Sequence, residues 1–391
     1  MAVLTISNES SSWVAARTLP LDYTTSFKNF TLQAAALLTE PVCKVREYAY
    51  TFSILGPLCS TTRQKVQKAF FLALGIVVYS LLSPLALGGI VLRQLVAACA
   101  SEPYVRLEMA PSGKILPANK QISVWTHNGC YMPGGYSITD GQILPPSYTE
   151  NMDAKIRQIQ TFDPDLVCLS EVPDILDASR LTGHLTAYPF ILEVPGFQAI
   201  GPSSMLYVAS KYKLVDIRFE PFVPGSELTG RAASSRMGFL SFDLEGTNVS
   251  VIHTHLQPSD VPSQPKLREM RSRAAQIDKM ARHILRKQTQ GFKIFLTGDL
   301  NQSENELNAS LVRNGLQLRR DPAIVGKATW GGEKWGADLM NRPPSDPQVL
   351  DYALADPTVA ISTQILDTGF SKDEFRLNAL SDHFPLFTTL N

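Results

Sequence analysis

A run of 24 residues without a charged side chain, AFFLALGIVVYSLLSPLALGGIVL at 69–92, restricts the fold of this 391-residue chain more than any other feature. A helix needs about 20 apolar residues to cross the hydrocarbon core of a membrane, so this segment is long enough to span one. It begins too far from the N-terminus to be a simple cleaved signal peptide. Buried core helices are rarely this long without one polar anchor. We therefore predict that the chain is membrane-associated through residues 69–92.

The internal Pro84 and the Gly88–Gly89 pair leave two arrangements open for this segment, a single span or a re-entrant hairpin with both flanks on one side. Basic residues are more frequent before the segment than after it, which in a spanning arrangement places the N-terminus in the cytoplasm. Those before it are Lys44, Arg46, Arg63, Lys65 and Lys68, and those after it are Arg93 and Arg106. The side on which the rest of the chain lies stays open.

Charge and cysteine content exclude some classes of protein. Lys plus Arg and Asp plus Glu both number 36, so the net charge is zero and there is no strong signal for nucleic-acid binding. The five cysteines are scattered and contain no CxxC pair, so they are predicted to be free thiols rather than a zinc site or a disulfide framework.

From about residue 121, short apolar strands alternate with amphipathic helices. The pattern predicts an α/β protein with a four-layer α/β sandwich, in which two packed β-sheets are flanked by helices. The helix predicted within 265–288 has apolar residues at helical spacing, and its charged residues are expected to form a solvated face. His184 and His283 are expected at the surface. We divide the chain into an N-terminal region of unassigned fold (1–68), the hydrophobic membrane segment (69–98) and a catalytic domain (115–391).

Polar residues gather in or at the ends of the apolar strands. They are all Asn, Asp, Glu or His, namely Asn128, Glu171, His255, Asp299, Asn301, Asp351, Asp382 and His383. Buried carboxylates without partners are costly, so these residues should share a cation or a histidine network. On an extended backbone, Asp299 and Asn301 would face the same side.

This residue set suits one kind of chemistry. The chain has neither a GxSxG nucleophile motif nor an HExxH zinc motif, and oxygen ligands favour a hard cation such as Mg²⁺. Carboxylates and histidines beside such a cation suit the attack of an activated water on a phosphoryl group.

Five short motifs, in order, resemble the endonuclease/exonuclease/phosphatase superfamily with its DNase I-like fold. They are LSEV with Glu171, THL with His255, GDLN with Asp299 and Asn301, LDY with Asp351, and SDH with Asp382 and His383. The resemblance covers the chain from about residue 121 to 391. HTHLQ at 253–257, the ATWGGEKWG stretch before QVLDYALAD, and LSDHFPL are most similar to neutral sphingomyelinases.

The resemblance implies a role for each residue. Glu171 would be the main Mg²⁺ ligand, with Asn128 beside it and Asp382 near the metal; Mn²⁺ is the expected substitute ion. His383 would activate the attacking water, oriented by Asp351. Asp299 and Asn301 would position water and phosphate, and His255 would stabilise the phosphoryl oxygens or the leaving group. Arg236 is a candidate substrate-binding residue, in place of a lysine that sphingomyelinases often carry nearby.

The leading hypothesis is therefore a membrane-anchored, Mg²⁺-dependent phosphodiesterase that hydrolyses sphingomyelin or a related phospholipid. The first alternative is a nuclease of the AP endonuclease or DNase type, or an inositol phosphatase, of the same superfamily. A non-catalytic interaction protein is a third reading, and it is disfavoured because Glu171, Asp299, Asn301 and His383 are all present. The oligomeric state stays open.

Overall fold

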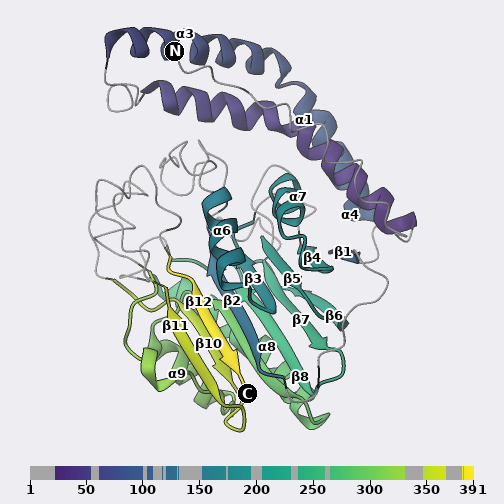
Figure 1. Ribbon diagram of the computed structural model, residues 1–391, viewed down its shortest axis with the longest axis vertical. Helices are drawn as coiled ribbons and strands as arrows, with labels where there is room; N and C mark the ends of the chain where they lie inside the picture. The colour runs from purple at the N-terminus through teal and green to yellow at the C-terminus, as the bar shows by residue number, and fades with distance from the viewer. Residues whose placement is uncertain are drawn as a thin grey trace.

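Two β-sheets pack face to face in the computed structural model, with helices on the outside and a helical unit across one end (Figure 1). The structure describes residues 23–53, 61–99, 104–108, 117, 120–129, 131, 152–172, 175–194, 205–229, 237–259, 265–330, 347–366, 381 and 383–391. The predicted architecture of two packed sheets flanked by helices is confirmed.

The first sheet has seven strands in the order β1-β4-β5-β3-β2-β12-β11. Their bounds are β1 Val105–Glu108, β2 Ile122–Asn128, β3 Leu166–Ser170, β4 Phe190–Val194, β5 Leu206–Ser210, β11 Ile361–Ile365 and β12 Leu386–Leu390. Only β2 and β3 are parallel among these described pairs. The helix α6 (Met152–Phe162) makes the crossover between them.

The second sheet has five strands in the order β10-β9-β8-β7-β6. Their bounds are β6 Leu214–Pro221, β7 Gly238–Leu244, β8 Val249–His255, β9 Lys293–Asp299 and β10 Asp351–Ala355. Here β8 and β9 are parallel, joined through the long helix α8 (Leu267–Thr289). Each sheet thus contains one parallel pair near its centre, and the carboxyl ends of such a pair meet at one edge.

Three hydrophobic clusters define the layers. Side chains of alternate positions point to opposite faces of a strand, so Val124 packs between the sheets while Trp125 packs outward. The outer face of the first sheet is covered by α6 and α7 (Ile175–His184). That of the second is covered by α8 and α9 (Glu304–Arg313), and a short 3₁₀ helix follows at Pro322–Ile324. The order of layers is helices, sheet, sheet, helices.

The N-terminal part of the chain forms three helices, α1 (Tyr23–Ser53), α3 (Thr62–Leu82) and α4 (Leu85–Cys99). Helix α3 begins with a capping box at Thr61, and Ser83–Pro84 separates it from α4. Among the described helices, α3 alone is long and apolar enough to cross a membrane, with a mean hydropathy of 1.5. A core helix can meet the same criterion, but only 6% of that stretch is buried here.

Helix α8 differs from its prediction on one point. Its charges were expected to be solvated, yet Arg273 and Lys287 are buried, and so is His283, which was expected at the surface. Lys287 Nζ donates to both carboxylate oxygens of Asp243 at 2.7 and 2.8 Å, and His283 Nε2 lies 2.8 Å from Ser241 Oγ. The helix therefore packs a partly polar face against the second sheet, where each charge has a partner on a strand or loop.

Candidate active site

Strand pairing brings most of the predicted site residues to one edge of the sandwich. In the first sheet, β2 and β3 end side by side, so Asn128 lies opposite Ser170, one residue before Glu171. In the second sheet, the ends of β8 and β9 place His255 opposite Asp299. The antiparallel strand β10 starts at this edge, so Asp351 is also paired with Asp299. His383 joins them because it lies three residues before β12, which pairs with β2.

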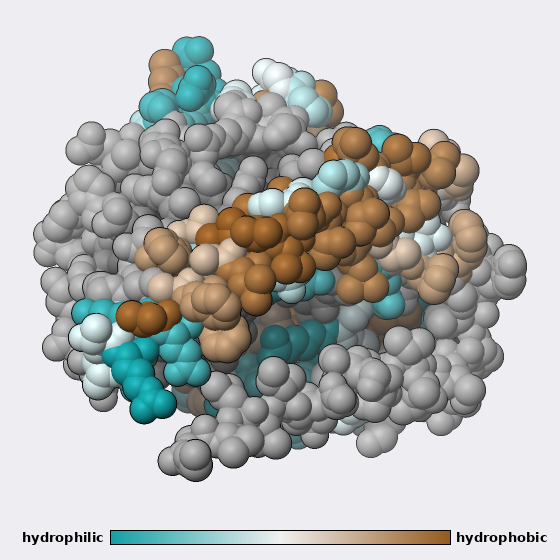
Figure 2. Space-filling view, turned by 90° about the horizontal axis from the view of Figure 1, so that it is seen from above, coloured by the Kyte–Doolittle hydropathy of each residue, from teal (hydrophilic) through white to brown (hydrophobic). Residues whose placement is uncertain are grey.

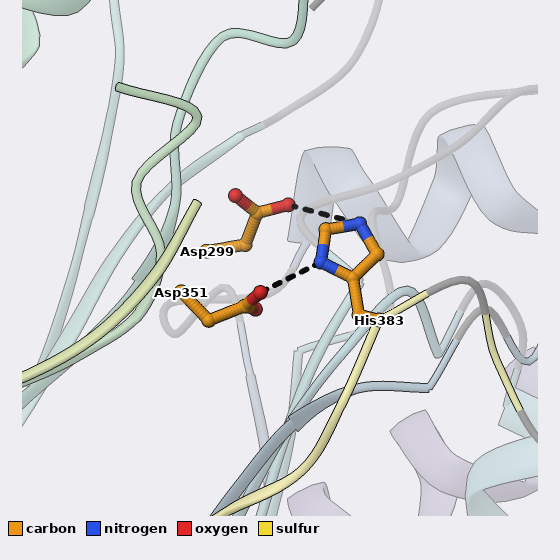
Figure 3. Close-up of side chains that lie close together, drawn as sticks. All are labelled: Asp299, Asp351 and His383. Carbon is orange, nitrogen blue, oxygen red and sulfur yellow. Dashed lines mark hydrogen bonds and ion pairs between the residues drawn. The ribbon is translucent and has the colours of Figure 1, made fainter. Parts of the chain in front are cut away.

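His383 and Asp351 form a close side-chain pair in the site (Figure 3). His383 Nδ1 lies 2.7 Å from Asp351 Oδ2, and both side chains are buried. With Nδ1 as the donor and the carboxylate as the acceptor, Nε2 would keep its lone pair and could act as a base. Nε2 faces Asp299 Oδ2 at 3.8 Å on its other side. The pair has the geometry of a histidine base oriented by a carboxylate.

Asn128 lies between Glu171, which follows a strand of the first sheet, and Asp299, which belongs to the second sheet. Its Nδ2 donates to Glu171 Oε1 at 3.2 Å and to Asp299 Oδ2 at 3.0 Å, and lies 3.5 Å from His383 Nε2. One amide therefore joins a residue of each sheet and the histidine. This places Glu171, Asp299 and His383 within reach of one bound group.

Burial controls the charge of Asp299 and His255. Burial raises the pKa of Asp299 to about 7, the neighbouring His383 opposes this shift and the Asp351 carboxylate adds to it. Burial also lowers the pKa of His255, while the nearby Glu171 carboxylate raises it. His255 Nε2 lies 3.5 Å from Asp299 Oδ2. Within the described part of the chain, His255 Nδ1 has no hydrogen-bond partner.

Strand β9 ends at Asp299, within the GDLN segment, and the chain then turns, so Asn301 does not continue the extended strand that the sequence predicted. Asn301 has φ +49°, its backbone N–H donates to Asp299 Oδ1 at 2.8 Å, and its side-chain Nδ2 donates to Leu256 O at 3.2 Å. Asparagine tolerates this left-handed region because its side chain bonds locally. Gly298, at φ +135°, could not carry a side chain, since a Cβ would lie 1.9 Å from Thr254 O. The turn holds Asp299 at the edge and directs Asn301 toward the loop after His255.

Glu171 also has a left-handed backbone, with φ +61°. For a residue other than Gly, Asn or Asp, this costs roughly 1–2 kcal/mol, and such strain concentrates at functional sites. Neighbouring backbone bonds hold it in place. Tyr131 N donates to Glu171 O at 2.9 Å, and Val172 N donates to Met205 O at 3.0 Å. The strained geometry turns the Glu171 side chain toward Asn128.

Two supporting residues, Ser381 and Thr329, had no predicted role. Ser381 Oγ donates to Asn128 O at 2.6 Å and accepts from His383 N at 3.1 Å. Thr329 Oγ1 accepts from Asp351 N at 2.9 Å, and Thr329 O accepts from Phe384 N at 2.7 Å. Ser381 belongs to the SDH motif and Thr329 to the ATWGGEKWG stretch. Their hydrogen bonds to the backbone of the site residues are seen only in the tertiary structure.

Of the nine candidate site residues, Arg236 and Asp382 lie outside the described residues. The other seven are all at this edge. Ligand atoms of Asp299, Asp351 and His383 lie within 4.8 Å of one another, a grouping that could hold a metal ion. Asp351 Oδ1 has no hydrogen-bond partner within the described ranges. The edge is therefore a buried, oxygen-rich site with one oriented histidine.

The comparison with protein families gives one match. A model of the endonuclease/exonuclease/phosphatase family matches residues 151–383, more than half of the chain. No curated protein sequence matches the chain.

The comparison with solved structures gives matches to one bacterial toxin and to a sphingomyelinase. Beta toxin from Staphylococcus aureus matches with a TM-score of 0.55 at 20% identity, covering 68% of this chain and 99% of the toxin chain. A mutant of the same toxin with bound magnesium ions matches with a TM-score of 0.53 at 18% identity, covering 69% and 99%. Sphingomyelinase C from Streptomyces griseocarneus matches with a TM-score of 0.48 at 18% identity, covering 70% and 100%. At these identities, the toxin matches support the fold.

Proposed function

Because the chain belongs to the endonuclease/exonuclease/phosphatase family, we propose that it is a membrane-associated, Mg²⁺-dependent phosphodiesterase that hydrolyses sphingomyelin or a related phospholipid. The observation that carries the proposal is the buried His383–Asp351 pair, with a separation of 2.7 Å, beside Asn128, Glu171 and Asp299. Such a pair supplies a general base at the site where a phosphate would bind.

In this mechanism, His383 Nε2 accepts a proton from the water that attacks phosphorus. Asp351 keeps Nδ1 protonated and stabilises the imidazolium that forms. The new P–O bond replaces the bond to the lipid alcohol, which takes up a proton and leaves, so the headgroup departs as a phosphate monoester. Positioned bases of this kind contribute about 10²–10⁴-fold to a rate.

The residues present fit a hard divalent cation. Glu171 and Asp299 offer carboxylate oxygens on either side of Asn128, and Mg²⁺ prefers such ligands. We assign the cation to this group rather than to Asp351 and His383, since their mutual hydrogen bond already uses Nδ1 and Oδ2. When bound, Mg²⁺ would neutralise phosphate oxygens. The magnesium ions in the mutant beta toxin support this choice of ion.

The remaining site residues would act on the phosphate. Neutral His255 can donate a hydrogen bond to a phosphoryl oxygen or to the leaving group, since burial lowers its pKa. Asp299 lies within 4 Å of the rings of both histidines and can orient the attacking water. The Asn301 backbone, bonded to Asp299 Oδ1, fixes that carboxylate.

The lipid substrate is proposed from two features of the chain. The motifs around His255, Asp351 and His383 resemble those of neutral sphingomyelinases, and few residues of the apolar helix α3 are buried. A helix of this kind would keep the enzyme beside a lipid.

The test is hydrolysis by the full chain in detergent micelles with Mg²⁺, using sphingomyelin, phosphatidylcholine, abasic DNA and inositol polyphosphates as separate substrates. We expect release of phosphocholine from sphingomyelin, and activity lost on chelation and restored by Mg²⁺ or Mn²⁺. The test variant is His383→Gln, which should lose activity by about 10³-fold or more. The matched control is His184→Gln, which should keep the wild-type activity. Cleavage of DNA or inositol phosphates with no lipid cleaved would refute the substrate assignment.

A further inference from the structure

We propose that α1, α3 and α4 form a platform that lies in the plane of one membrane leaflet, with the active-site edge turned toward that leaflet. This goes beyond membrane association, and it rests on the proposed function only for the identity of the substrate there. The occupant of the platform's apolar surface is a lipid bilayer that contains anionic headgroups.

The outer surface of the platform is a continuous apolar strip (Figure 2). Its exposed large side chains on α3 and α4 are Val66, Phe70, Phe71, Leu74, Val77, Val78, Leu81, Leu82, Leu85, Leu87, Val91 and Leu95. Soluble proteins rarely expose contiguous apolar patches of this kind unless they are interaction surfaces. The strip runs along the helix axes, so the flat apolar layer of a membrane matches its shape better than the narrow binding groove of a partner protein.

Helix α1 fixes the platform to the catalytic domain. Lys28 Nζ donates to Tyr104 O at 2.7 Å, and Gln33 Nε2 donates to Ser179 Oγ on α7 at 3.2 Å. Leu32 and Ala36 of α1 are buried in the same hydrophobic cluster as Trp125 of β2. The platform and the sandwich therefore share one hydrophobic cluster.

Close helix packing then holds α3 and α4 along the length of α1. A Cβ at Gly89 would lie 2.5 Å from Ala35 O, and one at Gly75 would lie 2.2 Å from the Tyr48 ring. The Tyr48 and Tyr79 rings meet edge to face, with centroids 5.5 Å apart. If α3 crossed a bilayer alone, it would have to leave α1, or α1 would have to leave the core. The packing therefore favours the in-plane arrangement over a span.

The platform and the site lie at the same end of the molecule. Figure 1 shows α1 and α3 beyond the end of the sandwich at which β2 finishes and β12 begins, and Asn128 and His383 are at that end. A leaflet that covers the strip would therefore lie at the same end of the molecule as the active-site edge, beside the outer surface of the platform.

Charge at the start of α3 matches an anionic surface. Arg63, Lys65 and Lys68 are exposed, and α3 contains no acidic residue. Basic residues near the surface of an anionic membrane each favour binding. They lie at one end of the strip, where headgroups would meet the edge of the platform.

The test measures the depth of α3 in vesicles of phosphatidylcholine and phosphatidylserine. Tryptophan is placed at three exposed sites of the full chain, as Val66→Trp, Leu74→Trp and Leu81→Trp, and quenched with phosphatidylcholines brominated near the headgroup or near the chain end. Wild type provides the baseline, and Val312→Trp on the distant α9 is the control that should stay unquenched. We expect equal, shallow depths at the three positions. A span predicts depths that differ by about 20 Å between Val66 and Leu81, given the helical rise of about 1.5 Å per residue.

A depth that changes steadily along α3, or no vesicle binding, would overturn the proposal. Hydrolysis in detergent micelles, measured in parallel, reports on the proposed function separately. A second variant pair tests the packing in the vesicle-bound state. Gly89→Ala should speed hydrogen exchange of the amides around Leu32 about tenfold, whereas Gly88→Ala, whose Cβ would have 3.7 Å to its nearest neighbour, should not. Equal exchange in the two variants would show that α4 leaves α1 in the membrane and would overturn the platform.

Discussion

At the residue scale, Glu193 on β4 shows how burial alone sets the charge of a side chain away from the active site. It is 1% exposed, and Thr182 Oγ1 donates to its Oε1 at 2.9 Å. Its Oε2 has no hydrogen-bond partner in the described ranges. Burial raises the pKa of Glu193 from 4.5 to about 8, and the Thr182 hydrogen bond only partly opposes this shift.

Glu193→Gln should therefore flatten the pH dependence of stability. Between about pH 4.5 and 8, folded wild type holds a proton that the unfolded chain has lost, so its free energy of unfolding falls as pH rises. The slope is at most about 1.4 kcal/mol per pH unit. We expect the variant to match wild type near pH 5 and to exceed it near pH 8, measured by urea denaturation.

The control for Glu193 is Glu245→Gln, at a partly exposed carboxylate paired with Lys213. It should follow the wild-type curve within about 0.5 kcal/mol across the same pH range. If Glu193→Gln were destabilised equally at both pH values, the buried carboxyl would not titrate in this window.

At the element scale, α8 supports the active site through a buried charge. Arg273 Nη1 donates to Gln257 O at 3.3 Å and to Ser259 Oγ at 2.8 Å, both in the loop after His255. Its Nη2 donates to Glu306 Oε1 at 3.3 Å, in the first turn of α9, which follows the turn at Asn301. One guanidinium thus joins the segments that follow β8 and β9.

Arg273→Met should cost about 3 kcal/mol of folding stability, because it leaves buried acceptors without a donor. The same substitution at exposed Arg271, two residues earlier on α8, should change stability by no more than about 0.5 kcal/mol. Urea denaturation measures both. Arg273→Met should also lower kcat/KM, since the loop after His255 loses its support. Equal stabilities of the two variants would show that the loop is held by other contacts.

Elements of this protein were easier to predict than the partners of their polar residues. The predicted alternation of strands with amphipathic helices is seen in α6, where Ile156 and Ile159 are buried at helical spacing, because apolar spacing follows directly from helix geometry. The burial of Arg273 on α8 was not predicted, since its acceptors lie up to 33 residues away in the sequence.

The site residues divide in the same way. Strand-end Asn, Asp, Glu and His could be recognised from the sequence, and seven of them lie together. The left-handed backbone of Glu171 and Asn301 could not be recognised from the sequence, because only the surrounding turns impose it.

At the scale of the whole molecule, the proposed cation would couple to folding without being required for it. The three hydrophobic clusters are built from side chains in the cores between and outside the sheets, so the sandwich should persist without metal. The carboxylates of Glu171 and Asp299, by contrast, gain a partner when a cation binds.

Saturating Mg²⁺ should therefore raise the melting temperature of wild type, with a stabilisation of about 2.7 kcal/mol at a hundredfold excess over Kd. Glu171→Gln should remove most of that increase, whereas Glu220→Gln, at a partly exposed carboxylate on β6, should keep it. Differential scanning calorimetry with Mg²⁺ or with a chelator measures the increase in each variant. The same Mg²⁺-dependent increase in Glu171→Gln would place the cation elsewhere.

The face between the two sheets has a consequence for how the protein would lose activity. His253 Nε2 on β8 lies 3.0 Å from Leu169 O on β3, Thr126 Oγ1 lies 2.6 Å from Thr297 Oγ1, and Asn128 Nδ2 lies 3.0 Å from Asp299 Oδ2. Each contact crosses from one sheet to the other, close to the site. Partial denaturation that separates the sheets would divide the site into two halves while both hydrogen-bonded ladders survive. Inactivation would then precede the loss of the β-strand signal in circular dichroism. Loss of activity would therefore report the first separation of the two sheets.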